Sequence, residues 1–252
     1  MLFVIFAVVV YFHLFYFVAL IKSDFSVIDT AWGMGFVVVT LSLLFQTPVL
    51  TSQQILLTTM ICAWALRLSL YLHFRNVKKG EDFRYRQWRE EWGDKANLIA
   101  YFKVFWLQAI ILLCVSSIIP ILWFSSSEGI SPWDYLALLI FCFGLFAEAI
   151  ADYQMNQFKK NEKNKGQLCL VGLWKYSRHP NYFGEILVWW GVFLLSISNQ
   201  QWMWAWIGPF LLTLLLLKVS GIPMLEKKYE GRADFEEYKR KTNALILWFP
   251  KK

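Results

Sequence analysis

The densest group of potentially reactive side chains lies in the run Tyr-Ser-Arg-His-Pro-Asn-Tyr-Phe-Gly-Glu at residues 176–185. Pro180 suits the first turn of a helix, where a missing N–H costs nothing, so Arg178 and His179 stand just before a predicted helix start. Helix N-termini favour anions through free N–H groups and the helix dipole. An ordinary cap does not need this combination of side chains, so we interpret the run as part of a ligand site.

Three stretches place polar side chains four residues apart, and each set therefore shares one face of a helix. The sets are Arg67, Tyr71 and Arg75; Glu148 and Asp152; and Asn181 and Glu185. Charges inside a membrane span are costly and usually face a cavity or the bundle interior. Carboxylates on one face repel unless a cation, a hydrogen-bond donor or a proton intervenes. We expect a pocket open to the cytoplasm that holds a ligand with amide, hydroxyl or phosphate groups.

The distribution of hydrophobic residues indicates which segments of the chain carry these side chains. The chain has 252 residues, 58% hydrophobic and 17% charged, against about 45–50% and about 25% in soluble domains. The excess falls in blocks long enough to cross about 30 Å of hydrocarbon. The blocks lie at about 2–21, 31–47, 53–74, 101–124, 133–152, 183–198 and 202–220. We predict an all-α membrane protein that forms one domain, a seven-transmembrane helix bundle.

Basic residues separate the two sides of the membrane. The Lys and Arg residues outside the blocks lie in four segments: the loops after the first, third and fifth blocks, and the tail. They include Lys22, Lys78, Lys79, Lys160 and Lys252. The other three loops hold none. The positive-inside rule predicts the N-terminus outside and the C-terminus in the cytoplasm. We expect the tail at 221–252 to pack on the side where the ligand binds.

Several function classes are disfavoured. The net charge of +7 comes from membrane-flanking loops, so no nucleic-acid partner is expected. The four cysteines form no C-x-x-C pair and the three histidines are scattered, which argues against a metal centre. His13 is interpreted as a hydrogen-bonded core residue. Neither a P-loop nor a Rossmann glycine pattern occurs, so a dinucleotide would have to bind without a Rossmann fold.

At this point the sequence resembles a known group, the steroid 5-alpha reductase-like superfamily, and most closely its branch of uncharacterised multi-pass proteins with a domain of unknown function. The resemblance rests on S-R-H-P-N-Y-F-G-E at 177–185 and covers nearly the whole chain. Further matching pieces are Asp29-x-x-Trp32-Gly33, Gly80-Glu81-Asp82-x-Arg84-Tyr85, Glu148-x-x-x-Asp152-x-Gln154, Ser220-Gly221-Ile222 and Tyr238.

The resemblance implies a seven-helix bundle that binds NADPH from the cytoplasm and reduces a lipophilic enone. It places Asn181, Glu185 and Asp152 on the cofactor, with Glu148 where the steroid reductases carry asparagine and Lys159 where they carry arginine. The full predicted cofactor set is Arg67, Arg75, Glu148, Asp152, Lys159, Arg178, His179, Asn181, Tyr182, Glu185 and Tyr238.

The chain departs from the steroid reductases near the start of the second span. Those enzymes carry a Gln-Glu pair that meets the steroid carbonyl, and this chain has Asp29-Thr30-Ala31-Trp32-Gly33. Asp29 is a candidate substitute acid and Tyr71 a candidate phenolic donor. The catalytic prediction is therefore Asp29 and Tyr71, and a steroid substrate is not implied.

Two alternatives stay open. Methyltransferases of the isoprenylcysteine carboxyl type, which use S-adenosylmethionine, share the Arg-His-Pro-x-Tyr core, and Glu226 in the tail fits them. The Glu148 and Asp152 pair, Asp29 to Trp32 and the loop from Gly80 favour the reductase. A non-catalytic transporter usually has repeats or broken helices, which the sequence lacks. The expected partners are a lipophilic small molecule and membrane lipids, the oligomeric state stays open, and short loops favour the bacterial inner membrane over the endoplasmic reticulum.

Overall fold

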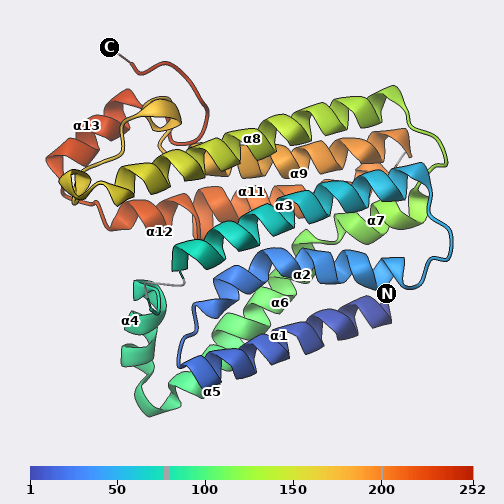
Figure 1. Cartoon of the computed structure of the whole chain (residues 1–252), viewed down its shortest axis with the longest axis horizontal. Coiled ribbons are helices and arrows are strands. Elements are labelled where there is room, and N and C mark those ends of the chain that lie inside the picture. Colours follow the sequence, from blue (N-terminus) through green and yellow to red (C-terminus); the bar gives the residue numbers. More distant parts are fainter. Residues whose placement is uncertain (77–79, 200, 252) are drawn as a thin grey trace. The chain divides into compact units, whose positions relative to one another are not determined.

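The computed structural model describes residues 1–76, 80–199 and 201–251, and the secondary structure in these ranges is helical (Figure 1). Lys78, Lys79 and Lys252, which contribute to the predicted charge asymmetry, lie outside the described residues. The chain divides into two compact units. The first is Met1–Ile130 with Met203–Gly208, and the second is Ser131–Trp202 with Pro209–Lys252.

Seven helical stretches among the described residues are long and apolar enough to cross a membrane. They are Leu2–Lys22, Val27–Leu44, Ser52–Asn76, Phe83–Ser125, Pro132–Lys160, Pro180–Ser198 and Trp202–Lys227. This confirms an all-helical, multi-pass protein with seven candidate spans, one for each predicted apolar block. The sidedness predicted from the basic loops stays a prediction.

The boundaries of the second span were predicted wrongly as 31–47, because α2 is Val27–Leu44. At its start the side chain of Asp24 accepts hydrogen bonds from the N–H and hydroxyl of Ser26 at 2.8 and 2.5 Å, which forms the turn before the helix. At its end Thr47 donates to the Leu43 carbonyl at 2.9 Å. Pro48 then disfavours helical backbone in the residue before it.

Two predicted loops contain helix. The segment 75–100 includes α4 (Phe83–Trp92) and α5 (Ala96–Ala100), and α8 runs from Pro132 to Lys160 past the predicted end at 152. Hydropathy missed α4 and the last turns of α8 because their sequences are polar, although Arg, Gln, Glu and Lys form helices well, and α5 is only five residues long. Asp82 also caps α4, since its side chain accepts a hydrogen bond from the Arg84 N–H at 3.1 Å.

The block predicted at 202–220 is not one regular helix. It comprises α10 (Trp202–Ala205), α11 (Ile207–Leu214) and the π-helical turn η5 (Leu215–Val219), and α12 (Ile222–Lys227) follows it. Likewise the fourth span contains a π-helical turn η2 (Tyr101–Trp106) before α6 (Leu107–Val115) and α7 (Ile118–Ser125). Such π-helical turns insert local irregularity into an α-helix.

In the first unit α2 packs against α1 (Leu2–Lys22), α3 (Ser52–Asn76), α6 and α7. Small residues let these backbones approach, as is usual for helices in lipid. A Cβ on Gly33 would lie 2.6 Å from the Ser69 hydroxyl oxygen, and one on Gly35 would lie 2.3 Å from a Leu112 methyl carbon. Gly33, noted in the sequence, is therefore needed for the contact between α2 and α3.

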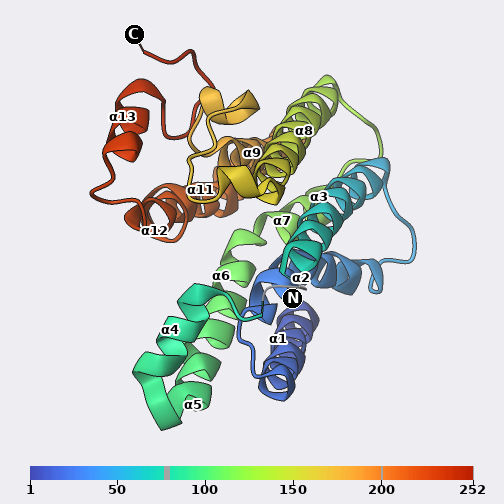
Figure 2. The ribbon, with the colours of Figure 1, turned by 60° about the vertical axis from the view of Figure 1, so that its left-hand side comes forward.

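In the second unit α8 and α9 (Pro180–Ser198) lie side by side (Figure 1) and are the most closely packed helices. A Cβ on Gly144 would lie 2.6 Å from the Gly184 carbonyl oxygen, and one on Gly184 would lie 2.5 Å from the Glu148 backbone nitrogen. Helices α12 and α13 (Ala233–Lys241) follow towards the C-terminus (Figure 2).

We expect Gly184→Val to lower the free energy of unfolding by about 1–3 kcal/mol, the usual cost of overpacking, because the neighbouring atoms are backbone and cannot rotate away. Gly129→Val is the matched control, since a Cβ there meets nothing within 4 Å. Thermal unfolding in detergent measures both variants. Equal midpoints for the two would contradict the close approach of α8 and α9.

Candidate functional site

Asp29, in the first turn of α2, is held by the segment that precedes and begins α4. Arg84 Nη2 lies 2.8 Å from Asp29 Oδ2, and the Tyr85 hydroxyl donates to Asp29 Oδ1 at 2.6 Å. Asp82 holds Arg84 in turn, with Arg84 Nε 2.9 Å from Asp82 Oδ1. Both carboxylate oxygens of Asp29 are therefore engaged within the first unit.

A second ion pair fastens the same segment to the turn before α2. Arg89 donates to Glu81 from Nε at 3.0 Å and from Nη2 at 2.8 Å, a bidentate arrangement. Glu81 Oε1 also accepts from the Phe25 N–H at 2.7 Å, and the Arg89 guanidinium lies 3.7 Å from the centre of the Phe25 ring. The Gly80-Glu81-Asp82-x-Arg84-Tyr85 motif thus positions Asp29, a role that sequence reasoning missed.

The predicted polar stripe on α3 is present. The Arg67 guanidinium lies 5.9 Å from the centre of the Tyr71 ring, and the Arg75 guanidinium lies 5.6 Å from the same centre. Cations at this distance from a ring are attracted by its negative face. Tyr71 therefore lies between two positive charges, whereas the phenol that hydrogen-bonds to Asp29 is Tyr85.

The second unit buries three carboxyl groups that the sequence singled out. Glu148 is 2% exposed, Asp152 6% and Glu185 9%. Gly184 lies against the backbone of Glu148, and Gly191 lies against that of Phe141, so α8 and α9 run in opposite directions. Asp152 is one turn after Glu148 on α8 and therefore lies near the start of α9. Asn181 lies in that first turn of α9.

Asn181 carries a buried side-chain oxygen, Oδ1, that no described residue satisfies with a hydrogen bond. Buried polar atoms in folded proteins nearly always have partners, so an exception asks for a ligand or a similar explanation. An N–H or O–H donor on a bound molecule would satisfy this oxygen, so the residues present fit an amide-bearing cofactor.

Arg178 and His179 meet on Glu226, at the end of α12. Arg178 Nε lies 2.8 Å from Glu226 Oε1, and His179 Nε2 lies 3.0 Å from the same oxygen. The imidazole of His179 stacks on Tyr182, with ring centres 5.5 Å apart and planes inclined by 11°. The predicted helix start at Pro180 is confirmed, and direct cofactor contact by these side chains stays a prediction.

The tail is bound to the segment before α9. Arg178 Nη1 donates to the Thr242 carbonyl at 2.6 Å, and the Arg178 N–H donates to the Asn243 carbonyl at 2.9 Å. Tyr238 donates to the carbonyls of Trp174 and Ser177, and burial raises its pKa above the usual value. Tyr238 therefore joins the tail to this segment as a neutral donor, and its predicted cofactor contact stays a prediction.

A cavity of about 660 Å³ lies between the tail and the segment at 166–175. Its lining includes both signs of charge. The residues that line it are Gly166, Gln167, Leu168, Leu170, Lys175, Asp234, Glu237, Tyr238, Lys241, Thr242 and Pro250. Its volume is within the range of small-molecule sites, about 300–1,000 Å³. Of the predicted cofactor residues only Tyr238 lines it, and Lys159 is exposed near the end of α8.

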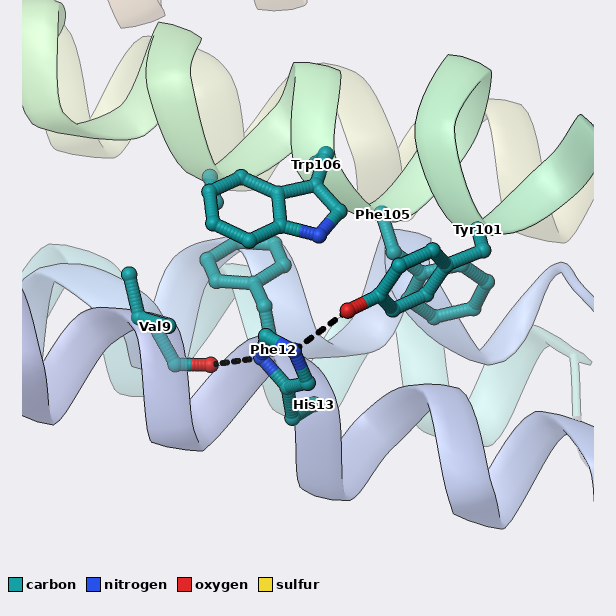
Figure 3. A pocket seen from close by; sticks show the side chains of 7 residues that line it. Val9, Phe12, His13, Tyr101, Phe105 and Trp106 are labelled. Atoms are coloured by element: carbon teal, nitrogen blue, oxygen red, sulfur yellow. Dashed lines mark hydrogen bonds between the residues drawn. The ribbon is translucent and has the colours of Figure 1, made fainter.

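A much smaller cavity, about 10 Å³, lies in the first unit between α1 and the π-helical turn η2 (Figure 3). Its only titratable groups are His13 and Tyr101, whose polar atoms lie 2.6 Å apart, and the second ring nitrogen of His13 lies 2.7 Å from the Val9 carbonyl oxygen. The space is about that of one water molecule. The hydrogen bonds predicted for His13 are confirmed, and its side chain is half-buried.

We expect Tyr85→Phe to lower the free energy of unfolding by about 1–3 kcal/mol, because it removes a donor from the partly buried Asp29 carboxylate. Tyr135→Phe is the control, since Tyr135 is 67% exposed and surface changes usually fall within about 0.5 kcal/mol. Chemical unfolding in detergent measures the two. A loss no larger for Tyr85→Phe than for the control would contradict the Asp29 contact.

Comparison with known proteins finds a family match and distant relatives. Residues 15–242 match a family described as "Protein of unknown function (DUF1295)". An uncharacterized protein of Schizosaccharomyces pombe is 27% identical over 174 residues, which cover 58% of this chain and 50% of that protein. The steroid 5-alpha-reductase DET2 of Gossypium hirsutum is 35% identical over 88 residues, which cover 34% of this chain and 32% of that protein.

A third relative carries a different printed activity. The probable O-methyltransferase ustE of Ustilaginoidea virens is 38% identical over 52 residues, which cover 21% of this chain and 18% of that protein. The chain therefore spans half or less of the length of each of these relatives. No solved structure matches the chain significantly.

Proposed function

We infer the function from the premise that this chain belongs to the DUF1295 family of proteins of unknown function. We propose that it is a membrane-embedded, NADPH-dependent reductase of the C=C bond in a lipophilic enone, either steroid-like or an isoprenoid lipid. Its distant, partial similarity to a steroid 5-alpha-reductase supports an oxidoreductase. The buried polar group on α8 and α9 supports a cofactor site within the second unit.

One observation carries the proposal. The Oδ1 atom of Asn181, at the start of α9, is buried without a hydrogen-bond partner among the described residues, and the buried Asp152 lies on the adjacent helix α8. Asn181 and Glu185 share a face of α9, and Glu148 and Asp152 share a face of α8. In the proposal these side chains accept hydrogen bonds from the amide and ribose hydroxyl groups of the cofactor. Exclusion of water by the lipid-embedded helices strengthens each of these bonds.

When bound, NADPH would supply a hydride to the β-carbon of the enone, and the protein would supply orientation and a proton. Proton donation to the substrate carbonyl oxygen by Tyr71 stays a prediction from the sequence. The guanidinium groups of Arg67 and Arg75 lie 5.9 and 5.6 Å from the centre of its ring.

Asp29 has a different role in this proposal from the acid predicted by sequence. Both of its carboxylate oxygens are engaged, Oδ2 with Arg84 at 2.8 Å and Oδ1 with the Tyr85 hydroxyl at 2.6 Å. We therefore assign Asp29 and Tyr85 to positioning the start of α2. The proposal retains Arg178, His179, Tyr182, Lys159 and Tyr238 as residues that shape or hold the cofactor side of the second unit.

The proposal includes an orientation. The basic loops and tail face the cytoplasm and the N-terminus lies outside, as the positive-inside rule predicts, with the tail on the cofactor side. NADPH then enters from the cytosol and the lipophilic substrate from the bilayer. We propose the bacterial inner membrane in preference to the endoplasmic reticulum.

Thermal unfolding of the purified protein with each cofactor tests the proposal. A ligand that binds only the folded state stabilises it by about 2.7 kcal/mol at a hundredfold excess over its Kd. We expect NADPH to raise the unfolding midpoint and S-adenosylmethionine to leave it unchanged. A shift with S-adenosylmethionine alone would establish the methyltransferase instead, and a response to neither would favour a non-catalytic protein.

A methyltransferase is the second candidate because of one group of side chains. Arg178, His179 and Glu226 meet in the second unit, as the shared Arg-His-Pro core of the membrane methyltransferases suggests. The partial similarity to a probable O-methyltransferase points the same way. The reductase remains the first candidate because it also accounts for the acidic and amide groups of α8 and α9.

A further inference from the structure

The final segment of the chain carries an apolar surface that the proposed chemistry does not use. Ile246 is 58% exposed, Trp248 65% and Phe249 74%. The segment at 244–250 is not helical, so its exposed side chains are not the lipid-facing side of a span. Large aromatic side chains exposed in sequence neighbours usually mark an interaction surface.

Backbone contacts fix this segment at the start of α9. The Trp248 N–H donates to the Tyr176 carbonyl at 3.1 Å, and the Ser177 hydroxyl donates to the Leu245 carbonyl at 2.7 Å. Tyr176 and Ser177 precede Pro180, the first residue of a candidate membrane span. The segment is therefore held at one end of this candidate span.

The charges around the segment suit a lipid surface. Exposed basic side chains flank the segment at Lys239, Arg240, Lys241 and Lys251. Lys239 and Lys241 also pair with Glu236 and Glu237 at 3.6 and 2.7 Å, so these four basic and two acidic side chains give residues 236–251 a net charge of +2. Basic segments next to a membrane are attracted to anionic lipids. Tryptophan is enriched where membrane meets water, because its ring is apolar and its N–H is polar.

We propose that residues 244–250 form an interfacial anchor whose partner is the head-group region of the bilayer. Ile246, Trp248 and Phe249 insert among the head groups, and the flanking basic side chains meet lipid phosphates. The anchor connects the lipid surface to Arg178, because the carbonyls of Thr242 and Asn243, just before the anchor, accept hydrogen bonds from that residue.

Photolabelling of the full-length protein in nanodiscs tests the anchor. One disc preparation contains a phospholipid with a diazirine next to the glycerol, and the other contains a phospholipid with a diazirine at the acyl-chain end. We expect the shallow probe to label residues 245–249 and the deep probe to label the spans alone. Labelling of the ends of α8 and α9 shows that the shallow probe reaches the protein. If residues 245–249 then stay unlabelled, the proposal is overturned.

Two variants test whether the Trp248 side chain itself is needed for shallow labelling. Trp248→Asp should lower shallow labelling of the segment by about threefold or more, because a carboxylate is repelled by anionic head groups, whereas Trp248→Phe should retain it. The map of the unchanged protein does not depend on how either variant folds. Crosslinks from the segment to a second copy of the chain, in place of lipid adducts, would also overturn the proposal.

Discussion

Arg178→Ala is expected to lower the free energy of unfolding by about 3–5 kcal/mol, the cost of leaving one partner of a buried ion pair alone. Arg178 and Glu226 have side chains only 10% and 15% exposed. The same guanidinium also donates to the Thr242 carbonyl at 2.6 Å, so its loss frees the tail. Chemical unfolding in detergent measures the first effect, and limited proteolysis of the tail measures the second.

The matched control is a second arginine–carboxylate pair in the same unit. Arg232 and Asp234 lie 2.6 Å apart but are 37% and 53% exposed, and exposed pairs contribute about 0–1 kcal/mol. Arg232→Ala should therefore change little. Arg178→Lys should recover only part of the loss, because an ammonium cannot reproduce the forked geometry. Equal effects for Arg178→Ala and Arg232→Ala would contradict the tail attachment.

Asn181→Ala, Asp152→Asn and Glu185→Gln are each expected to weaken NADPH binding by about 10–100-fold, which corresponds to about 1.4–2.8 kcal/mol. Loss of a hydrogen bond to a charged group usually costs a similar amount. Titration of NADPH followed by fluorescence or calorimetry measures the affinity of each variant.

Glu162→Gln is the control for this set, because Glu162 is an exposed carboxylate of the same unit. Its affinity for NADPH should match that of the unchanged protein. The variants should also keep their unfolding midpoints in the absence of cofactor within a few degrees, so that lost binding is not lost folding. Unchanged affinity in all three site variants would place the cofactor elsewhere.

The fold was largely predictable because hydropathy and local spacing are local signals. Each predicted apolar block corresponds to one candidate span, Pro180 begins its helix, and the four-residue spacing on α3 produces the contacts of Tyr71 with its two arginines. Some errors concern polar helix, as in α4 and the last turns of α8, where a polar sequence does not distinguish a helix from a loop. Others concern the bounds of α2 and the breaks within 202–220, which hydropathy does not show.

The partners of the site residues could not be predicted, because they are distant in sequence. Arg84 and Tyr85 reach Asp29 across 55 and 56 residues, and Arg178 reaches Glu226 across 48. No spacing rule connects such positions. The motif from Gly80 to Tyr85 was nevertheless noticed in the sequence, and its unusual density of charge next to a span was the available signal for a contact with Asp29.

Reduction of an enone by this protein is tested by label transfer from NADPH deuterated at the hydride position of its nicotinamide ring. The protein in nanodiscs is incubated with this cofactor and a panel of lipophilic enones, and the products are analysed by mass spectrometry. We expect a saturated product with one deuterium on the former β-carbon, and we expect no such product with Asn181→Ala. Transfer of a labelled methyl group from S-adenosylmethionine, with no deuterium transfer from NADPH, would contradict the reductase proposal.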